Sequence, residues 1–420
     1  MMRRSHIVQL AAVLALFAVT ACCPGNRAMS KEMLGDPQTP YPLAAAPRVG
    51  DIVHLPTGTK VTLDQMLDIA GDARVVYVGE THDNPASHLL ELQTLQGLEK
   101  RHPGQVALGM EMFTRSQQPV LDRWVAGELD EKAFIKKSRW FDNWKMDFDY
   151  YRDLLIFARD RRIPVIALNA EKSLVQAVRS KTPSELSPEE KGQMPEFDQS
   201  DPYQRGMAQG IFSGHSHGQM AIEGFLRVQT LWDETMAESA VRFLASPGGK
   251  NRQLLVVAGG NHISYGFGIP RRVFRRLPTS YVIIGGNEIV VSPEKKGQLM
   301  DVELPDFPMV PYHFQAYLSY SEMPKQGVLL GVMFEPTQGG RGLLVKNVVP
   351  GSNADRAGVK EDDLLLALDG EGLSDSFDLV YAVKKKHAGQ RSTLQVERQG
   401  RPLTLEVLYQ AGEPQPHGKP

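Results

Sequence analysis

The fold follows from one stretch of the chain, VVYVGETH over residues 75–82. It begins with apolar, mostly β-branched residues, turns at Gly79, and ends in polar side chains. A continuous apolar run of this length is typical of a parallel strand that is buried on both faces. Four further runs share the pattern: Val106–Met112, Pro164–Asn169, Leu254–Gly259 and Tyr281–Gly285. The sequence therefore predicts a set of buried parallel strands.

Helical patterns lie between these strands. Pro85 follows Asn84 and opens a helix, a second helix runs from Tyr150 to Arg162, and a longer one runs from Met220 to Leu244. Residues 182–206 contain four prolines and are expected to form a long irregular excursion. Alternation of strands and helices predicts an open, mainly parallel α/β sheet.

Polar side chains follow several of the predicted strands. Glu80 and His82 come after the first strand, Glu111 is near the end of the second, and His262 follows the fourth. Ligands of open parallel sheets bind outside the carboxyl ends of the strands, so these four residues are expected to share one crevice. Imidazole and carboxylate without thiol suit zinc, manganese or iron. We therefore predict a metal site there; the alternative is that the histidines cap helices or satisfy buried backbone groups.

A second histidine pair, His215 and His217, lies in a loop flanked by Gly214 and Gly218. Alternate histidines in such a loop are candidate ligands of a metal or of haem iron, although exposed loop histidines are common.

Composition excludes few classes of soluble protein. Of 420 residues, 42% are hydrophobic and 23% charged, and the formal net charge is −2. No basic stripe with interleaved aromatic residues indicates nucleic-acid binding. The basic run from Arg271 to Arg276 is interpreted as the solvated face of a helix, with an anion site as the alternative.

The N-terminal residues predict export and lipidation. Arg3 and Arg4 precede an apolar segment, Ile7–Val19, that is too short to span a bilayer. Val19-Thr20-Ala21-Cys22 resembles a bacterial lipobox, so residues 1–22 are interpreted as a lipoprotein signal with Cys22 as the lipidated residue. Residues 23–50 are rich in proline and are expected to be a tether. This predicts a lipid-anchored protein of the cell envelope, at the outer membrane and facing the periplasm.

Several motifs together resemble the ChaN family of haem-binding, iron-uptake-associated lipoproteins in the Tiki/TraB superfamily. They are GETHDN at 79–84, EMF at 111–113, WDETMA at 232–237, GGNH at 259–262 and GIPRRV at 268–273. The resemblance covers roughly residues 60–320, within a domain expected at 51–322. It implies an erythromycin-esterase-like α/β fold and haem binding, with His82, His262, His215, His217 and Tyr265 as candidate haem-binding residues. The resemblance does not decide between Tyr265 and three other tyrosines, Tyr150, Tyr151 and Tyr203, as the ligand of the iron. In some superfamily members, paired Gly-x-x-His motifs and glutamates support metal-dependent proteolysis, and Glu80, His82, Glu111 and His262 match that pattern.

Residues 325–411 resemble a PDZ domain of the bacterial type. Leu330-Gly331-Val332 matches the turn that binds a peptide carboxylate, and a helix is expected near Ser376–Lys385. Such a module adds a peptide as an extra strand and holds its terminal carboxylate with backbone N–H groups. The alternative is a purely structural β domain.

The sequence thus favours an envelope lipoprotein that binds haem through the α/β domain and a peptide through the PDZ domain. The second hypothesis is a hydrolase in which a divalent metal activates water and Glu80 acts as general base. The third is a scaffold without chemistry in its α/β domain. Each hypothesis leaves open whether the protein forms a homodimer.

Overall fold

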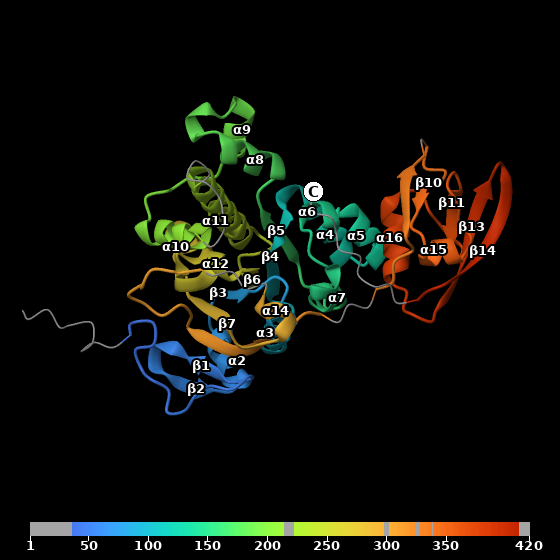
Figure 1. Ribbon diagram of the computed structural model, residues 1–420. Coiled ribbons are helices and arrows are strands. Elements are labelled where there is room, and N and C mark those ends of the chain that lie inside the picture. Colours follow the sequence, from blue (N-terminus) through green and yellow to red (C-terminus); the bar gives the residue numbers. More distant parts are fainter. Residues whose placement is uncertain (1–35, 214–221, 298–301, 324–326, 338, 411–420) are drawn as a thin grey trace, which may run out of the picture.

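The computed structural model describes residues 36–213, 222–297, 302–323, 327–337 and 339–410. These residues form an eight-stranded, mainly parallel sheet covered by helices, followed by a smaller antiparallel sheet (Figure 1). The predicted fold class is therefore confirmed. Among the described helices, none combines the length and the hydropathy that crossing a bilayer requires.

The eight strands follow the order β2-β1-β8-β7-β3-β6-β4-β5. The five predicted strands are present, and neighbours among them pair in parallel: β3 (Val75–Glu80), β4 (Val106–Thr114), β5 (Val165–Asn169), β6 (Gln253–Gly259) and β7 (Tyr281–Val291). Three strands were not predicted. β8 (Phe314–Tyr320) continues the parallel sheet beside β7, whereas β1 (Ile52–His54) and β2 (Thr59–Val61) add an antiparallel edge.

Alternate side chains of β3 enter two different cores, because successive side chains of a strand point to opposite faces. Val76 and Val78 pack beneath one group of helices, and Val75 and Tyr77 beneath the other. The first group consists of α2 (Leu63–Gly71), α3 (Pro85–Arg101), α4 (Gln118–Val125), α5 (Glu131–Lys137), α6 (Trp140–Asn143) and α7 (Arg152–Asp160). The second consists of α11 (Ile222–Ala245) and α13 (Ile269–Arg276). Burial on both faces explains why these strands lack polar alternation.

The predicted helices appear where expected. α3 begins after Asn84, whose side chain accepts a hydrogen bond from the Ala86 N–H, and Pro85 occupies the first turn.

The irregular excursion predicted at residues 182–206 is wrong in part. It contains α9 (Pro188–Gln193) and the start of α10 (Pro202–Ser213), because the prolines sit in first helical turns, where no donor is needed. The remaining helices of the domain are α8 (Lys172–Ser180), α12 (Gly260–Ile263) and α14 (Pro293–Lys296).

Residues 36–50 contain no helix or strand, yet they contact the α/β domain. Leu43 packs against a small apolar cluster with Val53, Leu55 and Tyr317. The Gln38 side chain accepts a hydrogen bond from the Tyr265 hydroxyl at 3.0 Å. This part of the expected tether therefore lies on the domain.

The C-terminal sheet has the order β14-β13-β11-β10-β9, with β12 paired to β11. Its strands are β9 (Val332–Pro336), β10 (Leu343–Val348), β11 (Leu364–Leu368), β12 (Glu371–Gly372), β13 (Arg391–Arg398) and β14 (Arg401–Leu408), joined by helices α15 (Asn353–Arg356) and α16 (Ser376–Lys384). Asn353 is buried and ties the ends of the module together: its amide donates to Leu329 O at 2.7 Å, and its Oδ1 accepts from the Gln410 N–H at 2.9 Å.

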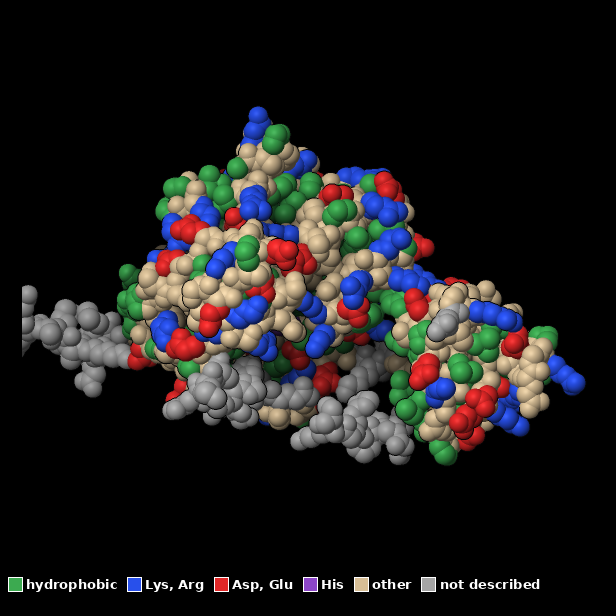
Figure 2. Space-filling model, turned by 90° about the horizontal axis from the view of Figure 1, so that it is seen from above, with side chains coloured by type: hydrophobic (Ala, Val, Ile, Leu, Met, Phe, Trp, Pro, Cys, Tyr) green, Lys and Arg blue, Asp and Glu red, His purple; other side chains and the backbone are tan. Residues whose placement is uncertain are grey.

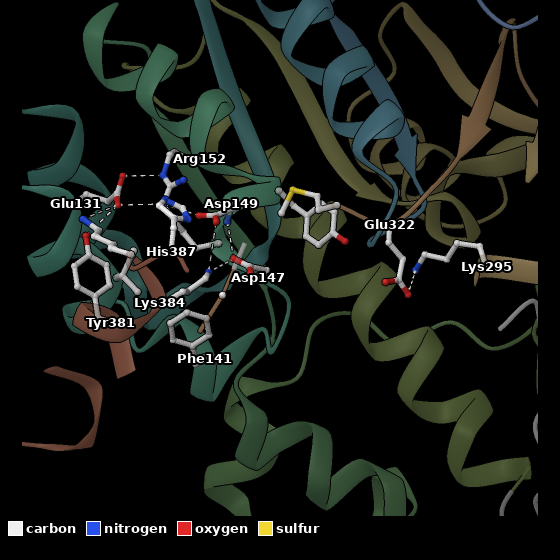
Figure 3. A pocket seen from close by; sticks show the side chains of 16 residues that line it. Glu131, Phe141, Asp147, Asp149, Arg152, Lys295, Glu322, Tyr381, Lys384 and His387 are labelled. Atoms are coloured by element: carbon white, nitrogen blue, oxygen red, sulfur yellow. Dashed lines mark hydrogen bonds and ion pairs between the residues drawn. The ribbon is translucent and has the colours of Figure 1, made fainter. Parts of the chain in front are cut away.

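Helix α16 packs against the helices of the first domain (Figure 1). Tyr381 is buried there, and its hydroxyl donates to Glu131 Oε1 at 3.0 Å. Lys136 of α5 pairs with Asp378, and Lys384 of α16 pairs with Asp147. A cavity opens beside this contact, and Figure 3 shows side chains of both domains pointing into it. On the face shown in Figure 2, charged side chains of both signs are interspersed over the two domains.

Candidate functional site: a carboxylate–histidine crevice

The four residues predicted to converge do so at the carboxyl ends of three neighbouring strands. Glu80 ends β3, His82 follows it, Glu111 lies in β4, and His262 lies in α12 after β6. His262 Nε2 is 3.6 Å from Glu111 Oε1. The Gly259 N–H, at the end of β6, donates to Glu111 Oε2 at 2.7 Å. The structure therefore brings His82, Glu111 and His262 to one edge of the sheet, with Glu80 beside His82.

Gly259 lies in close contact with the His82 ring and the Glu111 carboxylate. A Cβ atom at Gly259 would lie 2.9 Å from Cε1 and 3.1 Å from Nε2 of His82, and 3.6 Å from Glu111 Oε2. The backbone of β6 thus lies against the His82 ring and the Glu111 carboxylate.

Each imidazole is held by its own carboxylate. His82 Nδ1 is 2.5 Å from Glu80 Oε1, and His262 Nδ1 is 2.6 Å from Asp233 Oδ1. Asp233 Oδ2 also accepts from the Gln204 amide at 2.5 Å. In metal sites such carboxylate partners fix the ring orientation and raise the basicity of the other nitrogen. The Nε2 atom of each ring is therefore the natural ligand atom.

Glu80 stands behind His82 rather than facing the crevice. Its side chain is fully buried, and Oε1 also accepts from the Tyr151 hydroxyl at 2.8 Å. A general base must reach the water or substrate that it deprotonates. The general-base role and the crevice-ligand role predicted for Glu80 are therefore replaced by a positioning role toward His82.

The charges in the crevice shift the pKa values of both histidines. Burial lowers the pKa of His82, but the hydrogen bond to Glu80 and the charges of Glu80 and Glu111 outweigh it and raise the pKa to about 9. Burial also lowers the pKa of His262, but Glu111 and Asp233 raise it above its ordinary value. The carboxylates therefore favour the protonated form of both rings when no metal ion occupies their Nε2 atoms.

Tyr265 lies one turn beyond His262, on an aromatic stack. Its ring stacks on Phe267 at 5.4 Å, and Phe267 stacks on Tyr203 at 5.3 Å, both with an interplanar angle of 12°. Tyr265 adopts φ 58°, a left-handed conformation that is rare for an aromatic residue and that persists chiefly at functional sites. His215 and His217, the other predicted ligands, lie outside the described residues.

Sequence reasoning missed the partners that come from other elements. The sequence did not predict that Asp233 would hold His262 or that the Tyr151 hydroxyl would donate to Glu80. His88 and Glu91, on α3, are buried behind Glu80. Their spacing of three residues on one helix face was the available signal, but charged residues with that spacing are usually solvated.

The basic run on α13 has a structural role. Arg272 is fully buried, and its Nε lies 3.1 Å from Oε1 of the buried Glu234. Arg275 and Arg276 pair with the same carboxylate. The predicted solvated face is therefore wrong for these three arginines, which pack against Glu234 of α11, whereas Arg271 is 45% exposed.

The C-terminal sheet has an edge strand that is preceded by a left-handed turn. β9 is the last strand of its sheet, and Gly331, just before it, has φ +83°. A Cβ there would lie 2.2 Å from Ser352 Cβ, so the turn requires glycine. Leu330 is buried in the core, whereas Met333 of β9 and Val380 of α16 are 60% and 54% exposed.

Comparison with known proteins agrees with this architecture. A family model described as haem-binding uptake, Tiki superfamily, ChaN matches residues 66–273, and a PDZ domain model matches residues 328–408. A solved structure described as cofacial heme binding to ChaN of Campylobacter jejuni is 16% identical, with a TM-score of 0.50, over 67% of this chain and 100% of that chain. At this identity the likeness concerns the fold.

Two curated proteins are similar over shorter parts. Protein RETICULATA-RELATED 5, chloroplastic, of Arabidopsis thaliana is 24% identical over 247 residues, which are 54% of this chain and 32% of that protein. A probable periplasmic serine endoprotease DegP-like of Marinomonas sp. is 33% identical over 70 residues, 17% of this chain and 15% of that protein. The chain spans about a third or less of these relatives. With the crevice and the groove in place, the matches identify residues 66–273 as a domain of the ChaN family of the Tiki superfamily, joined to a C-terminal PDZ domain.

Proposed function

We propose that this protein binds haem through its α/β domain, with Tyr265 as the axial ligand of the iron. The observation that carries the proposal is the left-handed Tyr265 on the aromatic stack with Phe267 and Tyr203. Phenolate and imidazole are both axial ligands of haem iron in proteins. The donor set of Tyr265 and the neighbouring His262 therefore fits the group that the family match implies.

The surroundings of Tyr265 suit a flat, apolar macrocycle. Phe267 and Phe307 are buried beside it, and Tyr203 is 43% exposed at the outer end of the stack. Met207 of α10 completes the apolar cluster. The exposed ring of Tyr203 provides contact area for a porphyrin at low conformational cost.

A titration with ferric haem tests the proposal. The full-length wild type should give a shifted absorption band, and Tyr265→Phe should weaken binding at least tenfold, because phenylalanine keeps the stack and removes only the ligand oxygen. Tyr203→Phe is the matched control and should bind as the wild type does. An unchanged spectrum and affinity in Tyr265→Phe would sink the assignment.

Metal-dependent hydrolysis is the second candidate function. It is favoured by the two imidazoles whose Nδ1 atoms are held by Glu80 and Asp233 and whose Nε2 atoms are available beside Glu111. In this case, purified protein should carry zinc or manganese. His82→Ala and His262→Ala should each remove the crevice metal and the hydrolysis of peptides together.

The PDZ domain is proposed to bind the free C-terminus of an extended peptide. β9 offers an unpaired edge, and the Gly331 turn supplies backbone N–H groups for a carboxylate. A free-acid peptide library should yield binders that amidation of the terminus abolishes. Binding that is indifferent to amidation would contradict this mode.

The protein is further proposed to be anchored in the cell envelope through lipid on Cys22, which lies outside the described residues. Support comes from the sequence alone, in the small residues that precede Cys22 after an export signal. Cys22→Ser should release the protein from membranes in fractionation, and a variant that stays membrane-bound contradicts the anchor.

A further inference from the structure

A second cluster of ionisable side chains lies behind His82, away from the crevice. Glu80 of β3 meets His88 and Glu91 of α3, and the ligand atoms of all three lie within 4.8 Å of one another. His88 Nδ1 is 3.3 Å from Glu80 Oε2 and 3.1 Å from Glu91 Oε2. Both carboxylate side chains are fully buried, and that of His88 is 5% exposed.

The tautomer of His88 leaves buried carboxylate oxygens of this cluster without a donor. Its Nε2 donates to the carbonyl oxygen of His82 at 3.0 Å, so in the neutral ring the Nδ1 lone pair faces both carboxylates. Burial lowers the pKa of His88, which favours that neutral form. Glu80 Oε2 and Glu91 Oε1 are buried and have no hydrogen-bond donor among the described residues. Buried carboxylates without partners are costly, and coordination of a metal ion is one of the ways proteins compensate them.

We propose that Glu80, His88 and Glu91 bind a divalent first-row transition cation in this pocket. One imidazole nitrogen and two carboxylate oxygens are a donor set for Mn²⁺, Fe²⁺ or Zn²⁺. The two carboxylates supply negative charge for the dication within the buried site. The hydrogen bond from Nε2 to a backbone carbonyl is the outer-shell contact that ligating histidines almost always make.

Glu80 connects the buried ion to the crevice. Its Oε1 holds His82 and Tyr151, whereas its Oε2 faces His88 and Glu91. A cation on Oε2 keeps Glu80 ionised and fixed, so it holds His82 in position. The ion would act as a structural support for the crevice, and this inference does not depend on the haem proposal.

The test is the metal content of the full-length protein after equilibration with Mn²⁺, Fe²⁺ or Zn²⁺ alone and removal of free ion. The wild type should retain one buried ion per chain and should melt at a higher temperature than after chelation. Glu91→Gln should lower the affinity at least tenfold, because it keeps the shape and removes one ligand charge. Glu99→Gln is the matched control: Glu99 is a buried carboxylate on the same helix that accepts from the Gly104 N–H, and its loss should leave the ion in place.

Two outcomes overturn the proposal. The first is that the wild type retains none of the three metals, or that Glu91→Gln binds the ion as tightly as the wild type does. Either result means that the two carboxyl groups share a proton instead of a metal ion. If His262→Ala removes the ion and Glu91→Gln does not, the ion belongs to the crevice. His88→Gln adds a second variant, and circular dichroism establishes that each variant is folded. The haem titration with Tyr265→Phe is independent of these results, so failure of one proposal leaves the other to its own test.

Discussion

Tyr381→Ala is expected to uncouple the PDZ domain from the α/β domain. The Tyr381 side chain belongs to the core cluster of the first domain, stacks on Phe377 at 5.4 Å, and donates a hydrogen bond to Glu131. Truncation of a buried aromatic residue costs about 3–5 kcal/mol. Because part of the ring rests on its own helix, we expect a loss near the lower value, about 3 kcal/mol.

Calorimetry of the full-length protein measures this loss. A change of 1 kcal/mol shifts the melting temperature of a domain of this size by roughly 4–8 °C, so the PDZ transition should fall by more than 10 °C and separate from that of the first domain. Tyr381→Phe, which loses only the hydrogen bond, should lose about 1 kcal/mol. Val380→Ala is the matched control because Val380 is 54% exposed on the same helix, and it should change little. A PDZ transition that does not move in Tyr381→Ala would refute the interdomain contact.

Three further changes test other parts of the structure. Burial alone raises the pKa of Asp378, but hydrogen bonds from Ser374 and Lys136 lower it to about 2. The stability that this carboxylate provides is therefore present above its unfolded value of 3.8 and is lost as the pH falls toward 2. Between pH 5 and pH 2, the free energy of unfolding measured by urea titration should fall by about 1–2 kcal/mol more in the wild type than in Asp378→Asn. An equal fall in both proteins would contradict this linkage. Gly259→Ala should displace His82 and weaken ligand binding in the crevice, while Gly297→Ala, whose added Cβ meets nothing within 4 Å, should bind normally. Arg272→Ala should lower the free energy of unfolding by about 3 kcal/mol, because it removes a buried partner of Glu234; a loss below that of the exposed Arg271→Ala would rule out the network.

The centre of the fold was predictable because its signals are local. Each of β3, β4 and β6 is buried along its whole length and mostly apolar, and α3, between β3 and β4, begins at the start signal Asn84-Pro85. β1 and β2 were not predictable, since three residues are too few to show a period. The docking of α16 depends on contacts between distant residues, and the sequence of one helix does not encode its partner.

The sequence predicted some residues of the candidate site but not the contacts between them. Glu111 and His262 follow from the rule that parallel strands bring their carboxyl ends to one edge. The pairing of His262 with Asp233 depends on how α11 packs on the sheet, and these residues are 29 positions apart. The inward direction of Glu80 was also hidden, because the last residue of a strand can face either side.

The most direct test of the central claim is the ligand-field spectrum of the ferric haem complex of the full-length protein. Electron paramagnetic resonance and resonance Raman spectra together distinguish a phenolate from an imidazole on the iron. The structure of the Tyr265 turn predicts a phenolate-bound, high-spin ferric signal that disappears in Tyr265→Phe and persists in Tyr203→Phe. A complex with imidazole ligands only, or a wild type that does not bind haem, would contradict the account.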